Sequence, residues 1–204
     1  AKIAESQVLK CPDKLTTDSK YTQKLYKEKL DMDFDYLPSP IDVQKFSRIG
    51  NVKKIENQVA YVGRDSHEKG IDILKKAELQ INGDVVYCID RSWEDAMRVI
   101  KSSSVVVVPS RMESLPTVIK EAFYLNVPVV ATNVGGIPEL VVDNETGLLV
   151  PSENPEKIAY SVNELLSDTE KAKKLSRNGN DFVKKNMTWD IIFPKYIQFY
   201  KNLL

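Results

Sequence analysis

Four charged side chains are spaced in a way that suits a ligand carrying both phosphate and hydroxyl groups. Arg64 and Lys69 lie in the loop GRDSHEKG (63–70), which follows the apolar run VAYVG. Two cations beside a helix N-terminus favour diphosphate oxygens, because free N–H groups, the helix dipole and ion pairs all attract negative charge. Glu113 and Glu121 lie eight positions apart in ESLPTVIKE, which follows VVVVP. Two carboxylates at different depths can each accept hydrogen bonds from hydroxyls of one extended ligand.

Each pair also has a simpler interpretation, which spacing alone favours. Arg64 and Lys69 can pair with Asp65 and Glu68 on a solvated loop. The two glutamates can be a capping acid and a surface side chain. If Pro116 is the first helical residue, the two carboxylates lie about 7 Å apart along the helix axis, so they do not form a proton-sharing pair.

Five short apolar runs predict the sheet that must position these side chains. They are β-branched and apolar throughout, as expected for strands buried on both faces of a parallel sheet. Helical patterns separate them, which indicates an α/β fold with a doubly wound parallel sheet and right-handed crossovers. The runs are VAYVG (59–63), VVYCI (85–89), VVVVP (105–109), PVVAT (128–132) and GLLV (147–150).

The order of the strands decides where a ligand binds. In open parallel sheets, ligands bind beyond the carboxyl ends of the strands at the point where the strand order reverses. For the common order 3-2-1-4-5-6 that point lies between the first and fourth strands. The loops 63–70 and 110–117 then flank one crevice, which is a prediction from topology.

The predicted helices differ in how clearly they are delimited. SWEDAMRVIKS begins with Ser92 as N-cap and Asp95 at the capping-box position, and PTVIKEAFYLN begins with Pro116. Pro138 is expected to start another helix after the pair Gly135-Gly136, which permits close backbone approach. Further predicted segments are the strands KLTT (14–17) and FDYL (34–37), the helix KYTQKLYKEKL (20–30) capped by Asp18 or Ser19, and the linker 39–58. C-terminal helices are predicted over 155–168, 169–186 and 188–204, and Pro194 is expected to kink or divide the last of them.

Composition excludes several classes of protein. Lys+Arg and Asp+Glu balance at 29 each, so no global field attracts nucleic acid or anionic lipid. Cys11, Cys88 and the single His67 make neither a disulfide framework nor a metal cluster. The longest apolar stretches are too short for a membrane span, and AKIAESQVLK lacks the apolar core of a signal peptide. We therefore expect a reducing, cytoplasmic compartment, with peripheral membrane attachment through an acceptor or partner as the open alternative.

Several motifs in the right order resemble the C-terminal, donor-binding half of a GT-B glycosyltransferase of family GT4. VGRDSHEKGIDIL resembles the family's diphosphate-binding loop, and the segment from ESLPTVIKEAFYL to ETGLLVP resembles its E-x7-E motif and the adjoining C-terminal stretch. MTWDIIFPKYIQFYKNLL is similar to the family's last helix. The resemblance implies a remnant of the N-terminal domain and hinge at 1–46, a nucleotide-sugar-binding Rossmann-like domain at 47–186, and a helix crossing back at 187–204.

The resemblance also implies a function: retaining transfer of a sugar from a UDP- or GDP-sugar to an unknown glycan, lipid or small-molecule acceptor. No metal or other cofactor is expected, nor nucleic acid. A partner chain or second copy is expected to cover the exposed N-terminal unit. The implied residues are Arg64 and Lys69 on the diphosphate, Glu113 on the donor sugar, Glu121 on the ribose, the backbone of Ser114, Leu115, Pro116 and Thr117 on sugar and phosphate, and Ile89 near the base, with Glu113, Arg64 and Lys69 acting in catalysis.

The chain departs from the family pattern between KGIDILKKAEL and GDVVYCID, where only QIN intervenes in place of a further βα unit. If that unit is absent, strand 85–89 can pair beside strand 59–63 and leave the crevice intact. The alternative function is a degenerate GT-B half that binds nucleotide or a partner without turnover. A dinucleotide-binding domain is disfavoured, because the loop 63–70 lacks G-x-G-x-x-G.

Overall fold

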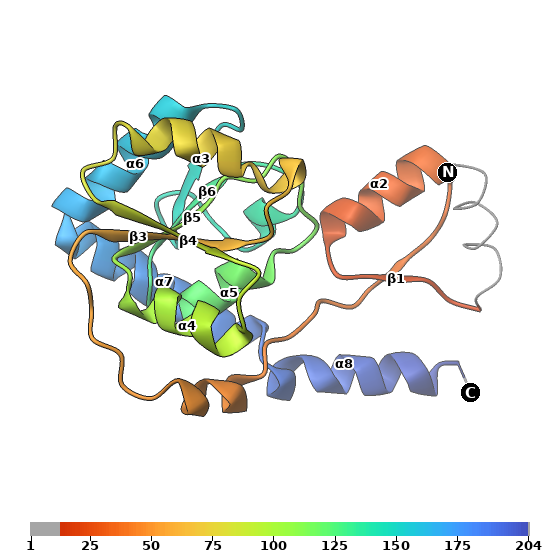
Figure 1. The fold of residues 1–204 in the computed structure, drawn as a ribbon. Helices are drawn as coiled ribbons and strands as arrows, with labels where there is room; N and C mark the ends of the chain where they lie inside the picture. Colours follow the sequence, from red (N-terminus) through yellow and green to blue (C-terminus); the bar gives the residue numbers. More distant parts are fainter. Residues whose placement is uncertain (1–12, 204) are drawn as a thin grey trace.

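Five parallel strands form the central sheet in the order β4-β3-β5-β6-β7 (Figure 1). This computed structural model of the protein describes residues 13–203, so Cys11 and the start of the predicted 1–46 unit lie outside the described residues. The strands are short and match the five apolar runs. Their bounds are β3 Gln58–Gly63, β4 Asp84–Ile89, β5 Val105–Val108, β6 Val129–Thr132 and β7 Leu148–Val150.

The sheet is covered by helices on both faces, which explains why its strands do not alternate between apolar and polar residues. Alternate residues of β5 belong to different apolar clusters: Val106 and Val108 face one side, Val105 and Val107 the other. Figure 1 shows α3 and α6 on one face and α4, α5 and α7 on the opposite face. These helices are α3 Ile71–Glu78, α4 Trp93–Ser102, α5 Thr117–Tyr124, α6 Pro155–Ser167 and α7 Thr169–Asn186.

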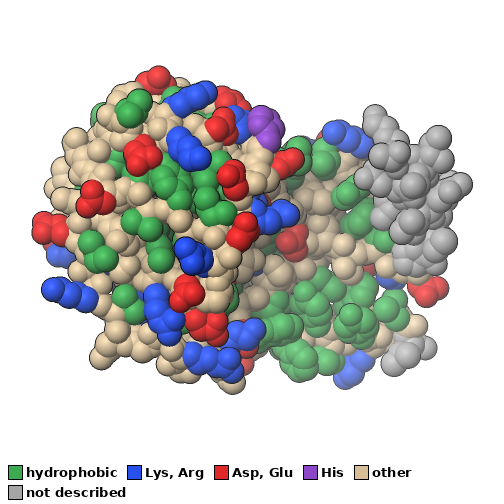
Figure 2. Space-filling view, in the orientation of Figure 1, with side chains coloured by type: hydrophobic (Ala, Val, Ile, Leu, Met, Phe, Trp, Pro, Cys, Tyr) green, Lys and Arg blue, Asp and Glu red, His purple; other side chains and the backbone are tan. Residues whose placement is uncertain are grey.

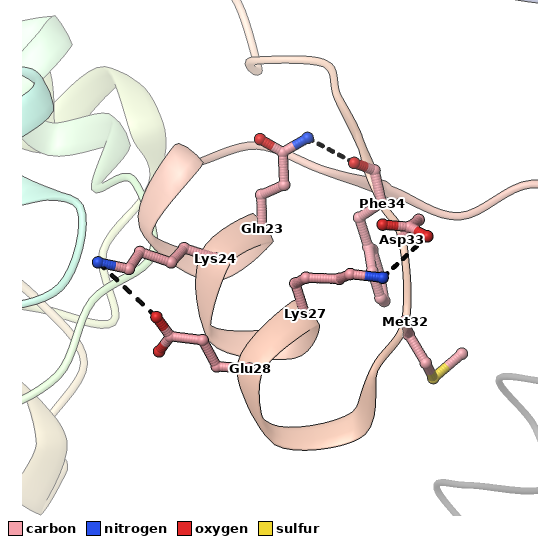
Figure 3. A pocket seen from close by; sticks show the side chains of 7 residues that line it. All are labelled: Gln23, Lys24, Lys27, Glu28, Met32, Asp33 and Phe34. Carbon is pink, nitrogen blue, oxygen red and sulfur yellow. Dashed lines mark hydrogen bonds and ion pairs between the residues drawn. The ribbon is translucent and has the colours of Figure 1, made fainter.

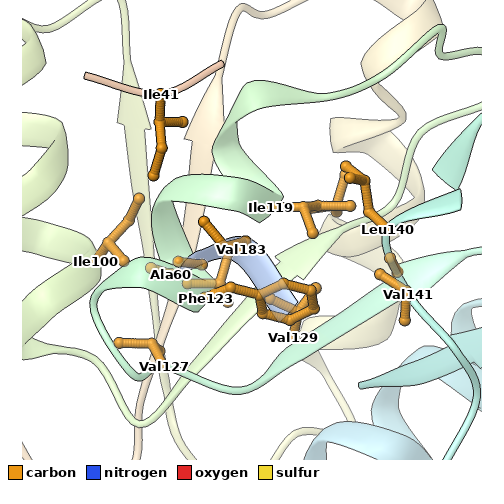
Figure 4. Packing of buried hydrophobic residues seen from close by; sticks show 14 of the residues in the cluster. Ile41, Ala60, Ile100, Ile119, Phe123, Val127, Val129, Leu140, Val141 and Val183 are labelled. Carbon is orange, nitrogen blue, oxygen red and sulfur yellow. The ribbon is translucent and has the colours of Figure 1, made fainter. Parts of the chain in front are cut away.

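The core beneath α5 fixes the helix that carries Glu121. Phe123 packs among buried aliphatic side chains from the sheet and from α7, including Val129 and Val183 (Figure 4). A Cβ on Gly179 of α7 would lie 2.5 Å from the Phe123 ring, so glycine is what allows α7 this close. Asn180 then donates to the carbonyl of Phe123 at 3.1 Å, which satisfies a helix-end acceptor of α5.

The strand order confirms the predicted reversal point. β3 pairs with β4 along its whole length, from Gln58 opposite Asp84 to Gly63 opposite Ile89, and pairs with β5 on its other side. The second strand thus lies directly beside the first, as expected for a sheet without a further βα unit between them. The loops after β3 and β5 leave the same edge of the sheet at its switch point.

A smaller unit precedes the sheet. The strands β1 Thr16–Thr17 and β2 Asp35–Tyr36 are parallel and flank α2 Lys20–Leu30, as the predicted βαβ pattern requires, but each strand keeps only two residues. Of the two candidate caps, Ser19 is the N-cap and accepts from the N–H of Thr22 at 3.0 Å. The predicted division of the chain into three domains stays a prediction.

Two prolines do not begin helices as expected, and a third does not divide its helix. Pro116 is the extended N-cap position of α5, with ψ 120°, and the helix begins at Thr117. Pro138 lies in a three-residue 3-10 turn, η3 Ile137–Glu139, because the chain turns into the buried Val141 segment before a longer helix can form. Pro194 does not divide α8, which runs Trp189–Lys201 with the proline inside it, and the alternative of a kink stays a prediction.

The predicted linker is partly ordered and partly buried. It contains a seven-residue 3-10 helix, η1 Val43–Ile49, whose last residue is 3% exposed in the core. Ile41 forms an isolated parallel bridge with Thr188, so the segment 39–58 contacts the start of α8. The packing of apolar residues, including Phe46 against Trp93, explains why this linker is held in place.

Apolar side chains remain exposed on α8, where Figure 2 shows a cluster of hydrophobic groups. Trp189, Phe193 and Tyr200 are 41%, 52% and 58% exposed. In the first 46 residues, Tyr21 and Leu30 are also exposed. Across residues 13–203, none of the helices combines the length and the apolar character needed to traverse a bilayer.

Candidate functional site

The loops 63–70 and 110–117 lie in direct contact beyond the switch point. The backbone N–H of Arg111 donates to the Glu68 carbonyl at 2.7 Å. Gly70 adopts φ +65°, and a Cβ there would lie 2.1 Å from the Pro109 carbonyl oxygen. Only glycine combines this left-handed backbone with so close an approach. The topological prediction that the two loops share one location is therefore confirmed.

An ion pair joins the two loops. Lys69 Nζ lies 2.6 Å from Glu113 Oε1, and the two side chains are 26% and 9% exposed. Ser110 Oγ donates to the same oxygen at 2.9 Å. The simpler interpretation, in which Lys69 pairs with Asp65 or Glu68 of its own loop, is wrong: the partner is the acid from the other loop.

Arg64 follows β3 directly and is exposed. Among the described residues it forms no ion pair, so its pairing with Asp65 or Glu68 is absent too. Its carbonyl accepts a 2.6 Å hydrogen bond from the Tyr61 hydroxyl. Burial, aided by nearby acids, raises the pKa of Tyr61 to about 12, so the hydroxyl remains a donor at neutral pH. The Arg64 backbone is held while its guanidinium is available.

Glu121 has a different environment from Glu113. The indole Nε1 of Trp93, the first residue of α4, donates to Glu121 Oε1 at 2.8 Å. Burial raises the pKa of Glu121, whereas the Trp93 hydrogen bond and the positive charge of Lys120 oppose that rise. The two acids have separate hydrogen-bond partners, so each can bind a different part of a ligand.

The remaining predicted residues lie on the same edge of the sheet. Ile89 ends β4 directly opposite Gly63, one residue before Arg64. Leu115 is 4% exposed and contributes to the core, so only its backbone is a candidate for ligand binding. Thr117 opens α5, whose first N–H groups have no acceptor within the helix.

Ser114 is held by the small N-terminal unit. Its hydroxyl hydrogen-bonds to the Asp18 carboxylate and lies 2.9 Å from the hydroxyls of both Ser19 and Thr22. Glu139 of η3 strengthens this contact by accepting from the N–H groups that begin α2, at 3.0 and 2.8 Å. The start of α2 is therefore docked on the loop that carries Glu113.

The Gly135-Gly136 pair explains the path of that loop. A Cβ on Gly135 would lie 1.8 Å from the carbonyl oxygen of Glu113, and one on Gly136 would lie 1.9 Å from that of Ser114. The close backbone approach predicted from the sequence is confirmed, and the segment approached is the loop that carries Glu113 and Ser114. These glycines form the support on which residues 113–114 rest.

Four contributors were missed by sequence reasoning: Tyr61, Trp93, Arg111 and Lys120. Helical spacing places Trp93 only in a buried stripe, although its position shortly after β4 brings its indole to the same sheet edge as Ile89. Arg111 and Lys120 act through contacts between segments distant in sequence, which leave no local pattern. Tyr61 bonds to a carbonyl only three residues away, but it lies in an apolar run that indicates only a buried strand. Within residues 13–203, no three or more His, Cys, Asp or Glu side chains form a group suited to a metal ion.

A surface hollow of about 380 Å³ lies elsewhere, on the small N-terminal unit (Figure 3). Its charged groups pair with one another, Lys27 with Asp33 at 3.2 Å and Lys24 with Glu28 at 3.7 Å. Gln23 donates to the Phe34 carbonyl across it. None of the predicted site residues lines this hollow, and its neutralised charges offer little to an anion.

Comparison with known proteins decides the family. The sequence pattern of the family described as glycosyl transferases group 1 matches residues 75–182, more than half of the chain. The chain belongs to this family. An uncharacterised glycosyltransferase of Methanocaldococcus jannaschii is 27% identical over 185 residues, which cover 76% of this chain and 47% of that protein. The chain thus spans about half the length of this relative.

Solved structures support the fold over nearly the whole chain. Sucrose-phosphate synthase from Thermosynechococcus elongatus has a TM-score of 0.85 at 23% identity, covering 98% of this chain and 61% of the synthase. The Anabaena protein HepE, solved in complex with UDP-glucose, has a TM-score of 0.78 at 17% identity, covering 93% and 64%. These similar structures are GT-B glycosyltransferases, so the predicted α/β fold with a doubly wound parallel sheet of the GT-B type is confirmed.

Proposed function

We propose that this chain is the donor-binding half of a retaining glycosyltransferase that binds a UDP- or GDP-sugar between the loops 63–70 and 110–117. The single observation that carries the proposal is the 2.6 Å ion pair between Lys69 and Glu113, which joins the two loops at the switch point of the sheet. A cation and an acid so placed match the two kinds of group in a nucleotide-sugar. The similarity to HepE, solved with UDP-glucose, supports the ligand class.

The diphosphate is assigned to Arg64 and Lys69. Arg64 is exposed and free of ion pairs among the described residues, so it can bind a phosphate without breaking a contact. Lys69 would exchange part of its interaction with Glu113 for the phosphate oxygens. Together with the N–H groups that begin α5, these cations stabilise the charge that develops on the leaving diphosphate, which is electrostatic catalysis without a metal.

The sugar rings are assigned to the two glutamates. Both protein donors to Glu113 reach Oε1, so within residues 13–203 Oε2 is left to accept from hydroxyls of the donor sugar. Glu121, oriented by Trp93, would accept from the ribose. The backbone of 114–117 would bind sugar and phosphate, and the end of β4 at Ile89 would meet the base.

A thermal-shift series with UDP- and GDP-sugars tests the proposal. A nucleotide-sugar at one hundred times its dissociation constant should raise the melting temperature by about 5–10 °C. Arg64→Ala and Glu121→Ala should abolish the shift. Arg98→Ala is the matched control. Arg98 lies on α4 and, within residues 13–203, forms an ion pair only with Asp95, at 3.3 Å, so its removal should leave the shift intact.

A transfer assay with the acceptor-binding half supplied distinguishes the enzyme from the degenerate module. Release of nucleoside diphosphate together with a glycosylated product is expected, and the anomeric configuration of that product tests retention. Binding without transfer or donor hydrolysis would favour the non-catalytic module. The absence of a shift with every nucleotide-sugar would overturn the proposal.

A further inference from the structure

We propose that Arg111 is a positioning residue that holds the loops 63–70 and 110–117 together and thereby sets the geometry of Lys69 and Glu113. This inference rests on the proposed function for the role of that pair. Arg111 is two residues before Glu113, and its side chain is 16% exposed. It lies in none of the motifs that indicated the site.

The guanidinium connects three segments. Nη1 and Nη2 bind the Asp72 carboxylate bidentately, at 2.6 and 2.8 Å, in the first turn of α3. Nη1 also donates to the His67 carbonyl at 2.7 Å, inside the loop that carries Lys69. Nε and Nη2 bind Glu153, which follows β7, the latter at 3.2 Å. The ends of β3, β5 and β7 are thus tied at one side chain.

This arrangement separates Arg111 from the ligand-binding cations. Its five N–H donors match the five hydrogen bonds to Asp72, Glu153 and His67. A phosphate could reach the guanidinium only by displacing these partners. The charge-assisted bonds also lower the pKa of Asp72 to about 2, so the clamp remains ionised through the neutral range. Arg111 therefore acts through the loops it joins.

Lysine cannot replace this residue. The planar guanidinium reaches two carboxylates and a carbonyl in fixed directions, whereas an ammonium group concentrates three donors at one point. Without the clamp, the direct links that remain between the two loops are the backbone bonds of 111 and 112 to Glu68 and the Lys69–Glu113 pair itself. Lys69 should then leave Glu113 more often.

The first test measures Lys69 in the ligand-free protein. The full chain is acetylated with N-hydroxysuccinimide acetate, and labelling of Lys69 is followed by mass spectrometry relative to Lys101. Arg111→Ala and Arg111→Lys should both speed Lys69 labelling by about fivefold. Asp72→Asn and Glu153→Gln, which each remove one arm of the clamp, should give smaller increases and keep the test informative if the Arg111 variants do not fold.

The second test measures coupling in UDP binding. Arg111→Ala should weaken binding of UDP by about tenfold in the wild-type background but by less than about twofold when Lys69 is already alanine, because the two residues act through one contact. A purely stabilising role predicts equal losses in both backgrounds. Folded Arg111 variants with unchanged Lys69 labelling, or with additive binding losses, would overturn the inference. If wild type binds GDP but not UDP, the same comparison is made with GDP. If it binds neither, the proposed function fails while the labelling result still decides the role of Arg111.

Discussion

Lys120 of α5 is a buried amine in the protein interior. Removal of this amine should change how the free energy of unfolding depends on pH. The side chain is 0% exposed. Its Nζ donates to the carbonyl and the hydroxyl of Ser39, at 2.7 and 2.9 Å, and so ties α5 to the segment 39–58. Lys120→Met keeps the length and apolar stem of the side chain but removes the amine.

The expected magnitude depends on the pKa of Lys120. Burial lowers this pKa from 10.5 to about 8, and the nearby carboxylates of Asp18 and Glu121 only partly oppose the effect. Between these values the unfolded chain holds a proton that the folded protein has released, so stability rises as pH rises. From pH 7 to about pH 9.5 the amine should add about 2 kcal/mol to the free energy of unfolding.

Urea unfolding followed by far-UV circular dichroism measures this contribution. The free energy of unfolding of wild type minus that of Lys120→Met should grow by about 2 kcal/mol between pH 7 and pH 9.5. Taking the difference removes titrations that the two proteins share. Lys101→Met is the matched control, since Lys101 also donates to a backbone carbonyl, that of Gly50 at 2.6 Å, but at the surface.

Two results would refute this reasoning. A difference that does not change with pH would mean that burial does not oppose the charge of Lys120. A change of the same size in Lys101→Met would assign the effect to general charge rather than to the buried site.

Two further substitutions test the supports of the site. Gly135→Ala should displace the Glu113 carbonyl that its Cβ would meet at 1.8 Å and abolish the nucleotide-induced thermal shift. Gly50→Ala is the control, because Gly50 has a similar φ of +62° but no atom within 4 Å of an added Cβ. It should show only the backbone strain of about 1–3 kcal/mol and keep the thermal shift. Equal shifts in both variants would contradict the supporting role. Trp93→Phe should raise the pKa of Glu121 further, because a hydrogen-bond donor to its ionised form is lost. When UDP affinity is measured at decreasing pH, the variant should therefore begin to lose affinity at a higher pH than wild type does. Trp189→Phe, at an exposed tryptophan of α8, is the control, and identical pH profiles would refute the role of the indole.

Local patterns in the chain were sufficient to predict most elements and their order. The helix of 20–30 has the predicted bounds, and Ser92 caps α4 by accepting from the Asp95 N–H at 3.1 Å. Such features depend on hydrogen bonds within a few residues. Helix ends after proline were less predictable: Pro116 and Pro138 are both compatible with a helix start, and whether a helix follows depends on where the chain must pack.

The parallel α/β sheet, the two loops beyond its switch point and the charged residues they carry are all encoded locally in the amino-acid sequence, through periodicity and turn chemistry. The partners of those residues are set by the tertiary structure. Lys69 pairs across to Glu113, Trp93 orients Glu121, and Arg111 closes the clamp on Asp72. Each contact joins segments 28 to 44 positions apart. The free energy of such contacts comes from burial and fixed geometry, which exist only after the sheet has brought the loops together.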